Sequence, residues 1–201
     1  MIIKRNGSAP EPVPAGNHVA RCIQLVDMGT QKSEWQGKVK FAAKVRITWE
    51  LPDVLKEFRE GEGEKPMLIS KTYTASMHEK AALSKDLESW RGRAFTDEER
   101  DGFDLKKVLG QPCLLNVIHE NKGGTVYANI ASVSPVPKGM PVKPAVNTVL
   151  VFSFDSYSSE VFESLPDFLK DKIRLSPEYA NATNGAQHSA EHFEDEIPDV
   201  F

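Results

Sequence analysis

The sequence predicts a mainly β fold, a small barrel of five strands followed by an acidic tail, from three observations. The segment 38–51 alternates apolar and polar residues, which is the period of a strand with one buried face. Four other segments of strand composition are separated by turns that contain Gly, Pro or Asn. One helical region interrupts the strands after the third.

The chain begins with an arm, a strand and a loop. Residues 1–16 include the run NGSAPEPVPAG and predict an extended N-terminal arm. Residues 17–27 are apolar and rich in β-forming residues, so they predict the first strand. Residues 29–38 (GTQKSEWQGK) are polar and bounded by glycines, which predicts a loop.

The alternating strand 38–51 has two different faces. Its odd-numbered residues are almost all apolar, and we assign Phe41 and Trp49 among them to the core. Its even-numbered residues form the solvent face. That face carries four cations: Lys38, Lys40, Lys44 and Arg46.

A charged hairpin-like excursion over 52–65 leads to a third strand over 66–76, rich in Ile, Thr and Tyr. A helix is predicted over 78–91, where Ser76 and Glu79 have the spacing of an N-terminal cap. Thr96 and Glu99 repeat this spacing. They begin a second helical stretch, 97–109, that Gly110 ends.

Two further strands, 111–120 and 125–135, are joined by the turn residues 121–124. Five strands with helical structure between the third and fourth is the order expected of an OB-fold, a partly open Greek-key barrel. The helix argues against an SH3-like barrel or a β-sandwich fragment. The predicted OB-fold domain therefore spans 17–135.

Three segments follow the predicted barrel. Residues 136–148 are Pro-rich and predict a linker. Residues 149–176 form an accessory segment, with a strand at its start and a helix over 160–173 that Pro166 interrupts. Residues 177–201 are polar and then acidic, so we expect a disordered tail.

Charge is distributed unevenly along the 201 residues, although the net charge is only −4. Residues 146–201 carry 3 Lys and Arg against 11 Asp and Glu, which leaves 22 against 18 for residues 1–145. A mildly basic body with an acidic end suggests polyanion binding plus a tail. The alternative is that both signs only solvate a surface.

The sequence contains no motif typical of catalysis or of nucleotide binding. Its glycines match neither a Walker loop nor GxGxxG, and its histidines form no HExxH frame. We interpret the carboxylates of 97–104 as a solvated helix start rather than a magnesium site. Cys22 and Cys113 predict buried thiols in a reducing compartment. We therefore expect no catalytic residue, no metal and no cofactor.

Neither a membrane span nor a signal peptide is expected. No apolar run approaches the ~18 residues that a spanning helix requires. The first residues carry two cations but no long apolar segment behind them. We therefore expect a soluble, intracellular protein.

The cationic strand face and the aromatic residues together predict binding of a single polynucleotide strand. Residues on one strand face repeat every ~6.6–6.8 Å, close to the spacing of about 6–7 Å between phosphates of an extended strand. Lysines that protect a sheet edge are the alternative. For base stacking we select an exposed Trp and two Tyr, each Tyr being equally a core candidate. The predicted contacts are Lys32, Trp35, Lys38, Lys40, Lys44, Arg46, Lys71, Tyr73, Lys122 and Tyr127.

The last twelve residues contain five carboxylates and no Lys or Arg, and they end on an aromatic ring. Such a segment is typical of a short linear ligand that charge steers to a basic partner, and it can also compete with DNA for the barrel. The predicted partner-binding residues are Phe193, Glu194, Asp195, Glu196, Ile197, Pro198, Asp199 and Phe201.

The stretches DMGTQKSEWQGK, KTYTAS, SWRGRAFT and YANIASVSP and the end EDEIPDVF resemble a bacteriophage family of single-stranded DNA-binding proteins with an OB-fold. The resemblance covers roughly residues 15–140. Bacterial members end on Pro-Phe, whereas Asp199 and Val200 separate Pro198 from Phe201 here, so the tip is an analogue. The resemblance implies a role in phage DNA replication or recombination, in the host bacterial cytoplasm, with partner proteins recruited by the tail.

We therefore expect a protein that coats single-stranded DNA without sequence preference and self-associates cooperatively along it. The rival interpretation is a protein-interaction module, such as a recombination mediator, whose basic face binds an acidic protein. A metal-dependent nuclease that uses the 97–104 carboxylates is a more distant third.

Overall fold

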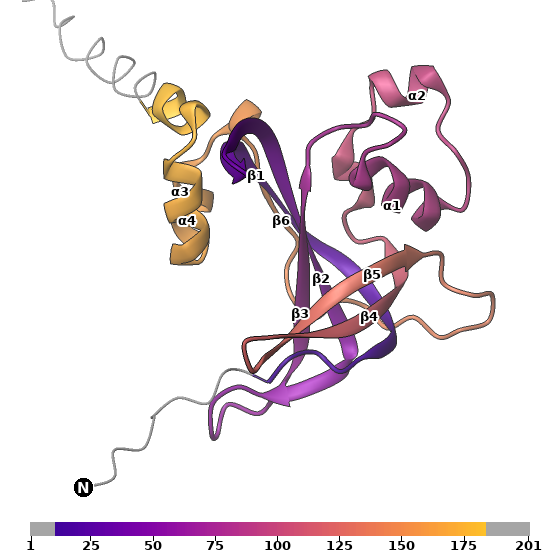
Figure 1. Cartoon of the computed structure of the whole chain (residues 1–201). Helices are drawn as coiled ribbons and strands as arrows, with labels where there is room; N and C mark the ends of the chain where they lie inside the picture. Colours follow the sequence, from indigo (N-terminus) through magenta and orange to yellow (C-terminus); the bar gives the residue numbers. More distant parts are fainter. Residues whose placement is uncertain (1–10, 184–201) are drawn as a thin grey trace, which may run out of the picture.

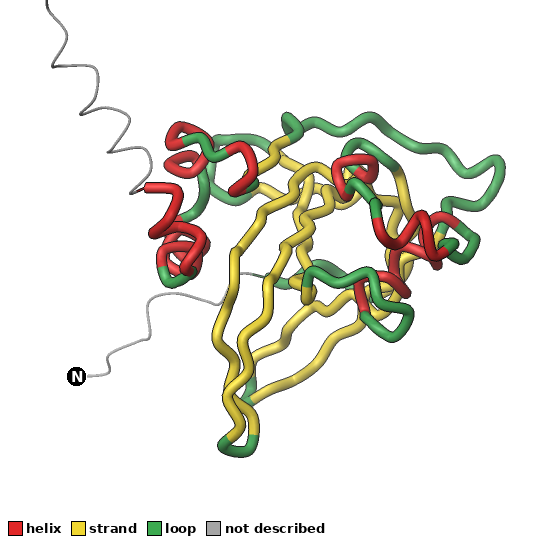
Figure 2. Tube along the Cα trace, turned by 90° about the horizontal axis from the view of Figure 1, so that it is seen from above, coloured by secondary structure: helices red, strands yellow, loops and turns green. Residues whose placement is uncertain are grey.

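A computed structural model describes residues 11–183 and places the strands at the centre of the molecule, with helices on two opposite sides (Figures 1 and 2). The sheet has the order β3-β2-β1-β4-β5, and β6 pairs in parallel with β1. The strands are β1 Gly16–Trp35, β2 Lys38–Glu57, β3 Glu64–Thr74, β4 Pro112–Lys122, β5 Thr125–Ser134 and β6 Leu150–Phe152.

The first four strands form a Greek key. β1, β2 and β3 follow one another as antiparallel hairpins, and β4 returns to pair with the first residues of β1. This arrangement confirms the mainly β class. In the described part of the chain no ladder joins β3 to β5, so the sheet is open on that side.

The Lys71 side chain reaches across the opening between β3 and β5. The Lys71 ammonium lies 2.7 Å from the Asp86 carboxylate of α1 and donates to the Ile130 carbonyl of β5 at 3.4 Å. This contact joins the two edge strands where a closed barrel would have backbone pairs.

The helices between β3 and β4 cover one end of the core enclosed by the curved sheet. They are α1 Ala82–Arg91, α2 Asp97–Asp101 and the 3₁₀ turn η1 Leu105–Val108. Trp90 of α1 packs on Trp49 of β2, with ring centroids 6.0 Å apart. The Thr96–Glu99 capping box is confirmed. The predicted cap at Ser76 is wrong, because α1 begins only after Ala81, without a side-chain cap.

The loop predicted over 29–38 is also wrong. β1 continues to Trp35, and only Gln36 and Gly37 form the turn to β2. Their φ angles of 50° and 72° are those of a two-residue turn whose twist matches the flanking strands. The polar composition of this segment is compatible with a strand, because the end of the hairpin, from residue 32 onward, is exposed wherever its side chains are described.

Part of the predicted N-terminal arm packs against the sheet. Val13 is buried in the core, and His119 of β4 makes a hydrogen bond of 2.8 Å with the Val13 carbonyl. Residues 1–10 of the predicted arm lie outside the described residues.

The accessory segment covers the outer face of β1 and builds a second apolar core around Val26 and Met28. Its elements after β6 are the 3₁₀ turn η2 Phe154–Ser156, α3 Ser159–Ser164 and α4 Asp167–Arg174, with the predicted interruption at Pro166 confirmed. Residues 177–183 are helical, contrary to the predicted disorder, because Tyr179 packs on Phe162 at 4.9 Å between ring centroids. The rest of the predicted tail lies outside the described residues.

The predicted linker 136–148 is fixed to the sheet at its end. The carboxylate of Glu50, which is fully buried, accepts hydrogen bonds from the backbone N–H groups of Val146 and Asn147 at 2.7 and 2.8 Å. Glu50 was assigned to the solvent face of β2 by its parity. The parity is right, but the linker covers that face at this position.

Candidate nucleic-acid interface

The end of the β1–β2 hairpin, residues 32–41, extends beyond the rest of the sheet, and we call it the hairpin tip. β3 pairs with β2 only from Lys44 onward, so the hairpin tip consists of two strands alone. Its side chains are exposed on both faces wherever the structure describes them.

Three predicted cations lie on the hairpin tip. Lys32, Lys38 and Lys40 are all exposed, and none forms a salt bridge with another residue of the range 11–183. Glu34 is the acidic residue of this segment. The hairpin tip is therefore a positively charged projection whose ammonium groups are accessible to phosphates.

Phe41 was assigned to the core and is instead 69% exposed. The register pairs it with Lys32, so the ring and this ammonium lie on the same face of the hairpin tip. The assignment was wrong because the alternating pattern of β2 extends into residues 38–41, where no second layer of the described structure packs on the strand. Phe41 is thus a candidate stacking residue that sequence reasoning missed, and only the strand pairing reveals it.

Trp35, the predicted stacking residue, ends β1 and pairs through its backbone with Lys38. Its side chain lies outside the part that the structure describes.

The other two cations of the predicted row are less accessible. Lys44 donates from its ammonium to the Thr74 hydroxyl at 2.8 Å. The Arg46 guanidinium lies 5.5 Å from the centre of the Phe168 ring of α4, and burial lowers the pKa of Arg46 from its usual value. The row of four therefore divides into an open pair and a partly covered pair.

The two predicted contacts on β3 differ in burial: Tyr73 is a core residue, contrary to its predicted stacking role, whereas Lys71 is partly exposed. Tyr73 is only 3% exposed and donates its hydroxyl to Asp86 at 2.7 Å; burial, followed by the Asp86 charge, raises the pKa of Tyr73 above its usual value. Lys71 forms an ion pair with the same carboxylate. Both side chains point toward α1, which the order of residues on β3 does not reveal.

The β4–β5 hairpin carries the last two predicted contacts. Tyr127 is 50% exposed, and Lys122 pairs with Glu120 at 3.0 Å on the surface. This hairpin and the hairpin tip both end on the side of the strands away from α1 and α2 (Figures 1 and 2). In OB-folds, the loops between strands 1 and 2 and between strands 4 and 5 flank the oligonucleotide-binding face.

The carboxylates of 97–104 hold the local backbone and its neighbouring arginines. Glu99 accepts hydrogen bonds from Arg91 and Arg93, at 2.7 and 2.9 Å for the closest atoms, and from the Thr96 backbone. These contacts lower the pKa of Glu99 to about 2, and the hydrogen bond from Arg91 has the largest effect. Within residues 11–183, no group of three or more His, Cys, Asp or Glu side chains is arranged to hold a metal ion.

Both cysteines are buried free thiols, and burial raises the pKa of Cys22 to about 12.

No helix in the described range combines the length and the apolar character that crossing a membrane requires.

No protein-family model matches the chain, and a search of curated proteins finds no similar sequence.

Proposed function

We propose that the protein binds single-stranded DNA without sequence preference, through the hairpin tip and the β4–β5 hairpin. The main observation behind this proposal is that Lys32, Lys38 and Lys40 are exposed on a two-stranded projection that also exposes Phe41. A ring that is 69% exposed beside exposed lysines gains little from the core. It is suited to stack on a base while the lysines contact phosphates.

The architecture supports the proposal. A Greek key with a fifth strand beside the fourth, open on one side, agrees with a partly open OB-type barrel, which we infer for residues 16–134. The aromatic surface continues on the β4–β5 hairpin, where Tyr127 offers a second ring.

In this mechanism the single strand of DNA lies across the hairpin tip and the β4–β5 hairpin. Each stacked base contributes about 1–3 kcal/mol, independently of its identity. Each phosphate that a lysine neutralises releases counterions, which makes binding salt-dependent. These surface features and the resemblance of the sequence to a phage family lead us to propose that the protein coats single-stranded DNA during phage replication or recombination. The acidic tail, outside the described residues, would recruit partner proteins.

The test is a titration of full-length protein with single- and double-stranded oligonucleotides at several salt concentrations. Replacing Lys32, Lys38 and Lys40 with Gln is expected to reduce the slope of log affinity against log salt by about 2, since each single-strand contact contributes about 0.7. The control replaces Lys80, Lys85 and Lys107, which are exposed on or near the helices between β3 and β4.

Phe41→Ala tests the stacking step separately. Affinity is expected to fall about 5- to 100-fold, the equivalent of one stacked base. Phe58→Ala is the matched control, because Phe58 is 53% exposed in the turn between β2 and β3. Equal losses in both variants, or no binding by the unmodified protein in dilute buffer, would reject the proposal and favour the protein-interaction module.

A further inference from the structure

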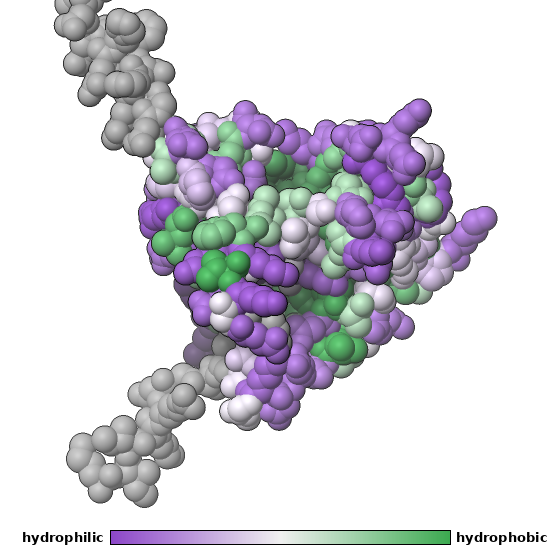
Figure 3. Space-filling model, turned by 45° about the horizontal axis from the view of Figure 1, so that its top comes forward, coloured by the Kyte–Doolittle hydropathy of each residue, from purple (hydrophilic) through white to green (hydrophobic). Residues whose placement is uncertain are grey.

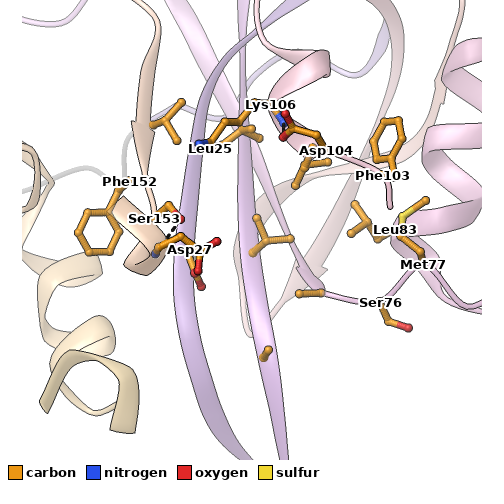
Figure 4. Close-up of a pocket in the computed structure, with 16 residues that line it drawn as sticks. Leu25, Asp27, Ser76, Met77, Leu83, Phe103, Asp104, Lys106, Phe152 and Ser153 are labelled. Atoms are coloured by element: carbon orange, nitrogen blue, oxygen red, sulfur yellow. Dashed lines mark hydrogen bonds between the residues drawn. The ribbon is translucent and has the colours of Figure 1, made fainter. Parts of the chain in front are cut away.

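A cleft of about 490 Å³ lies between the β1–β2 pair, the turn after β3, η1 and β6 (Figure 4). Its walls are mostly apolar and come from both cores: Leu25, Val45, Leu83, Phe103 and Phe152. Figure 3 shows green, apolar side chains in a hollow between two largely hydrophilic, purple regions. The cleft is therefore suited to apolar side chains.

Carboxylates are the main charged groups that line this cleft. Asp27, Asp104 and Asp155 contribute three negative charges, against the single cation Lys106. None of the three forms a salt bridge with any residue in the described range. Burial, and to a lesser extent the neighbouring Glu178 and Asp155, raises the pKa of Asp27. The occupant that fits is thus apolar and carries positive charge.

We propose that residues 2–5 of a second copy of this chain, Ile-Ile-Lys-Arg, occupy the cleft. The two isoleucines match the apolar walls, and Lys4 and Arg5 match the three carboxylates. This inference does not depend on DNA binding, because the cleft and the proposed DNA interface share no residue.

The reach of the arm explains why the occupant comes from a second copy. Glu11, where the described chain begins, pairs with Lys56, which the register places opposite Lys65 of β3. Ala75, which follows β3 and lines the cleft, lies ten residues beyond Lys65, a rise of about 33 Å along an extended strand. The eight residues from Ile3 to Glu11 span at most about 29 Å when fully extended. An arm therefore falls short of its own cleft, whereas two copies that exchange arms form two identical contacts and a closed dimer.

The test is sedimentation velocity of the full-length protein without DNA, over a wide range of concentrations. We expect reversible self-association that weakens at least about tenfold when Ile2 and Ile3 are replaced with Ser, because two apolar side chains lose their burial. Lys4→Glu combined with Arg5→Glu is expected to weaken it similarly.

A charge exchange identifies the cleft as the partner surface. Asp155→Lys is expected to weaken association, while Glu160→Lys, an exposed acidic residue of α3, leaves it unchanged. Asp155→Lys added to the Lys4→Glu, Arg5→Glu chain is expected to restore part of the lost association. A protein that stays monomeric at every concentration overturns the proposal. A spin label at residue 3 would then report whether the arm of the monomer contacts its own cleft, which overturns the proposal as well. Association that none of these variants alters overturns it equally.

Discussion

The two halves of the alternating segment 38–51 of β2 follow the same pattern but have opposite surroundings. In residues 38–41 both faces are exposed, whereas residues 45–51 are buried except for the half-buried Arg46. The second half has β3 beside it, the core below it and the linker and α4 above it. The comparison teaches that alternation predicts which side chains share a face. It does not predict whether another layer covers that face.

This difference separates stability from the proposed function along one strand. The covered half holds Trp49 and Leu51 in the core and binds the linker through Glu50. The uncovered half contributes little burial and presents the cations and the ring proposed to bind DNA. Changes in the two halves are therefore expected to affect different measurements.

The largest effect is expected from Glu50→Ala in the covered half. The variant removes the buried carboxylate that accepts from the N–H groups of Val146 and Asn147, and each hydrogen bond to a charged group contributes about 1.5–3 kcal/mol. We expect a loss of at least about 2 kcal/mol in denaturant unfolding and faster hydrogen exchange at residues 146 and 147. Glu60→Ala, at an exposed glutamate after β2, is the control. Equal stability of the two variants would contradict the role of Glu50.

A matched pair of valines tests the comparison with one chemical change. Val45→Ala removes two methyl groups from the core and is expected to cost about 2 kcal/mol of unfolding free energy. Val39→Ala makes the same change on the hairpin tip, where Val39 is exposed, and is expected to cost less than about 0.5 kcal/mol. Similar costs, measured by denaturant unfolding, would show that the tip is covered in solution.

The smallest effect concerns the boundary between the halves, at Arg46. Phe168→Ala removes the ring that lies over its guanidinium, at a cost of about 0.5–1 kcal/mol of stability. If the proposed DNA contact is correct, the freed guanidinium adds one phosphate contact, and the salt slope becomes steeper by about 0.7. Leu175→Ala, at an exposed residue just after α4, is the control. An unchanged slope would place Arg46 outside the binding surface.

The strand content of the chain and the pairing of its faces could be predicted from the sequence, because both follow from local periodicity. The alternation of 38–51 gave the correct parity for Val45, Trp49 and Glu50 alike. The capping box at Thr96 and the break at Pro166 were predictable because they depend on residues a few positions apart.

Only the tertiary structure decided which faces are covered, because coverage comes from segments distant in the sequence. Residues 146 and 147 cover Glu50, α4 covers Arg46, and α1 binds Lys71 and Tyr73 of the predicted interface. No segment covers Phe41 in the described structure, so it is exposed despite its core parity. Burial depends on the sum of contacts from the whole chain, and periodicity within one strand contains no information about them.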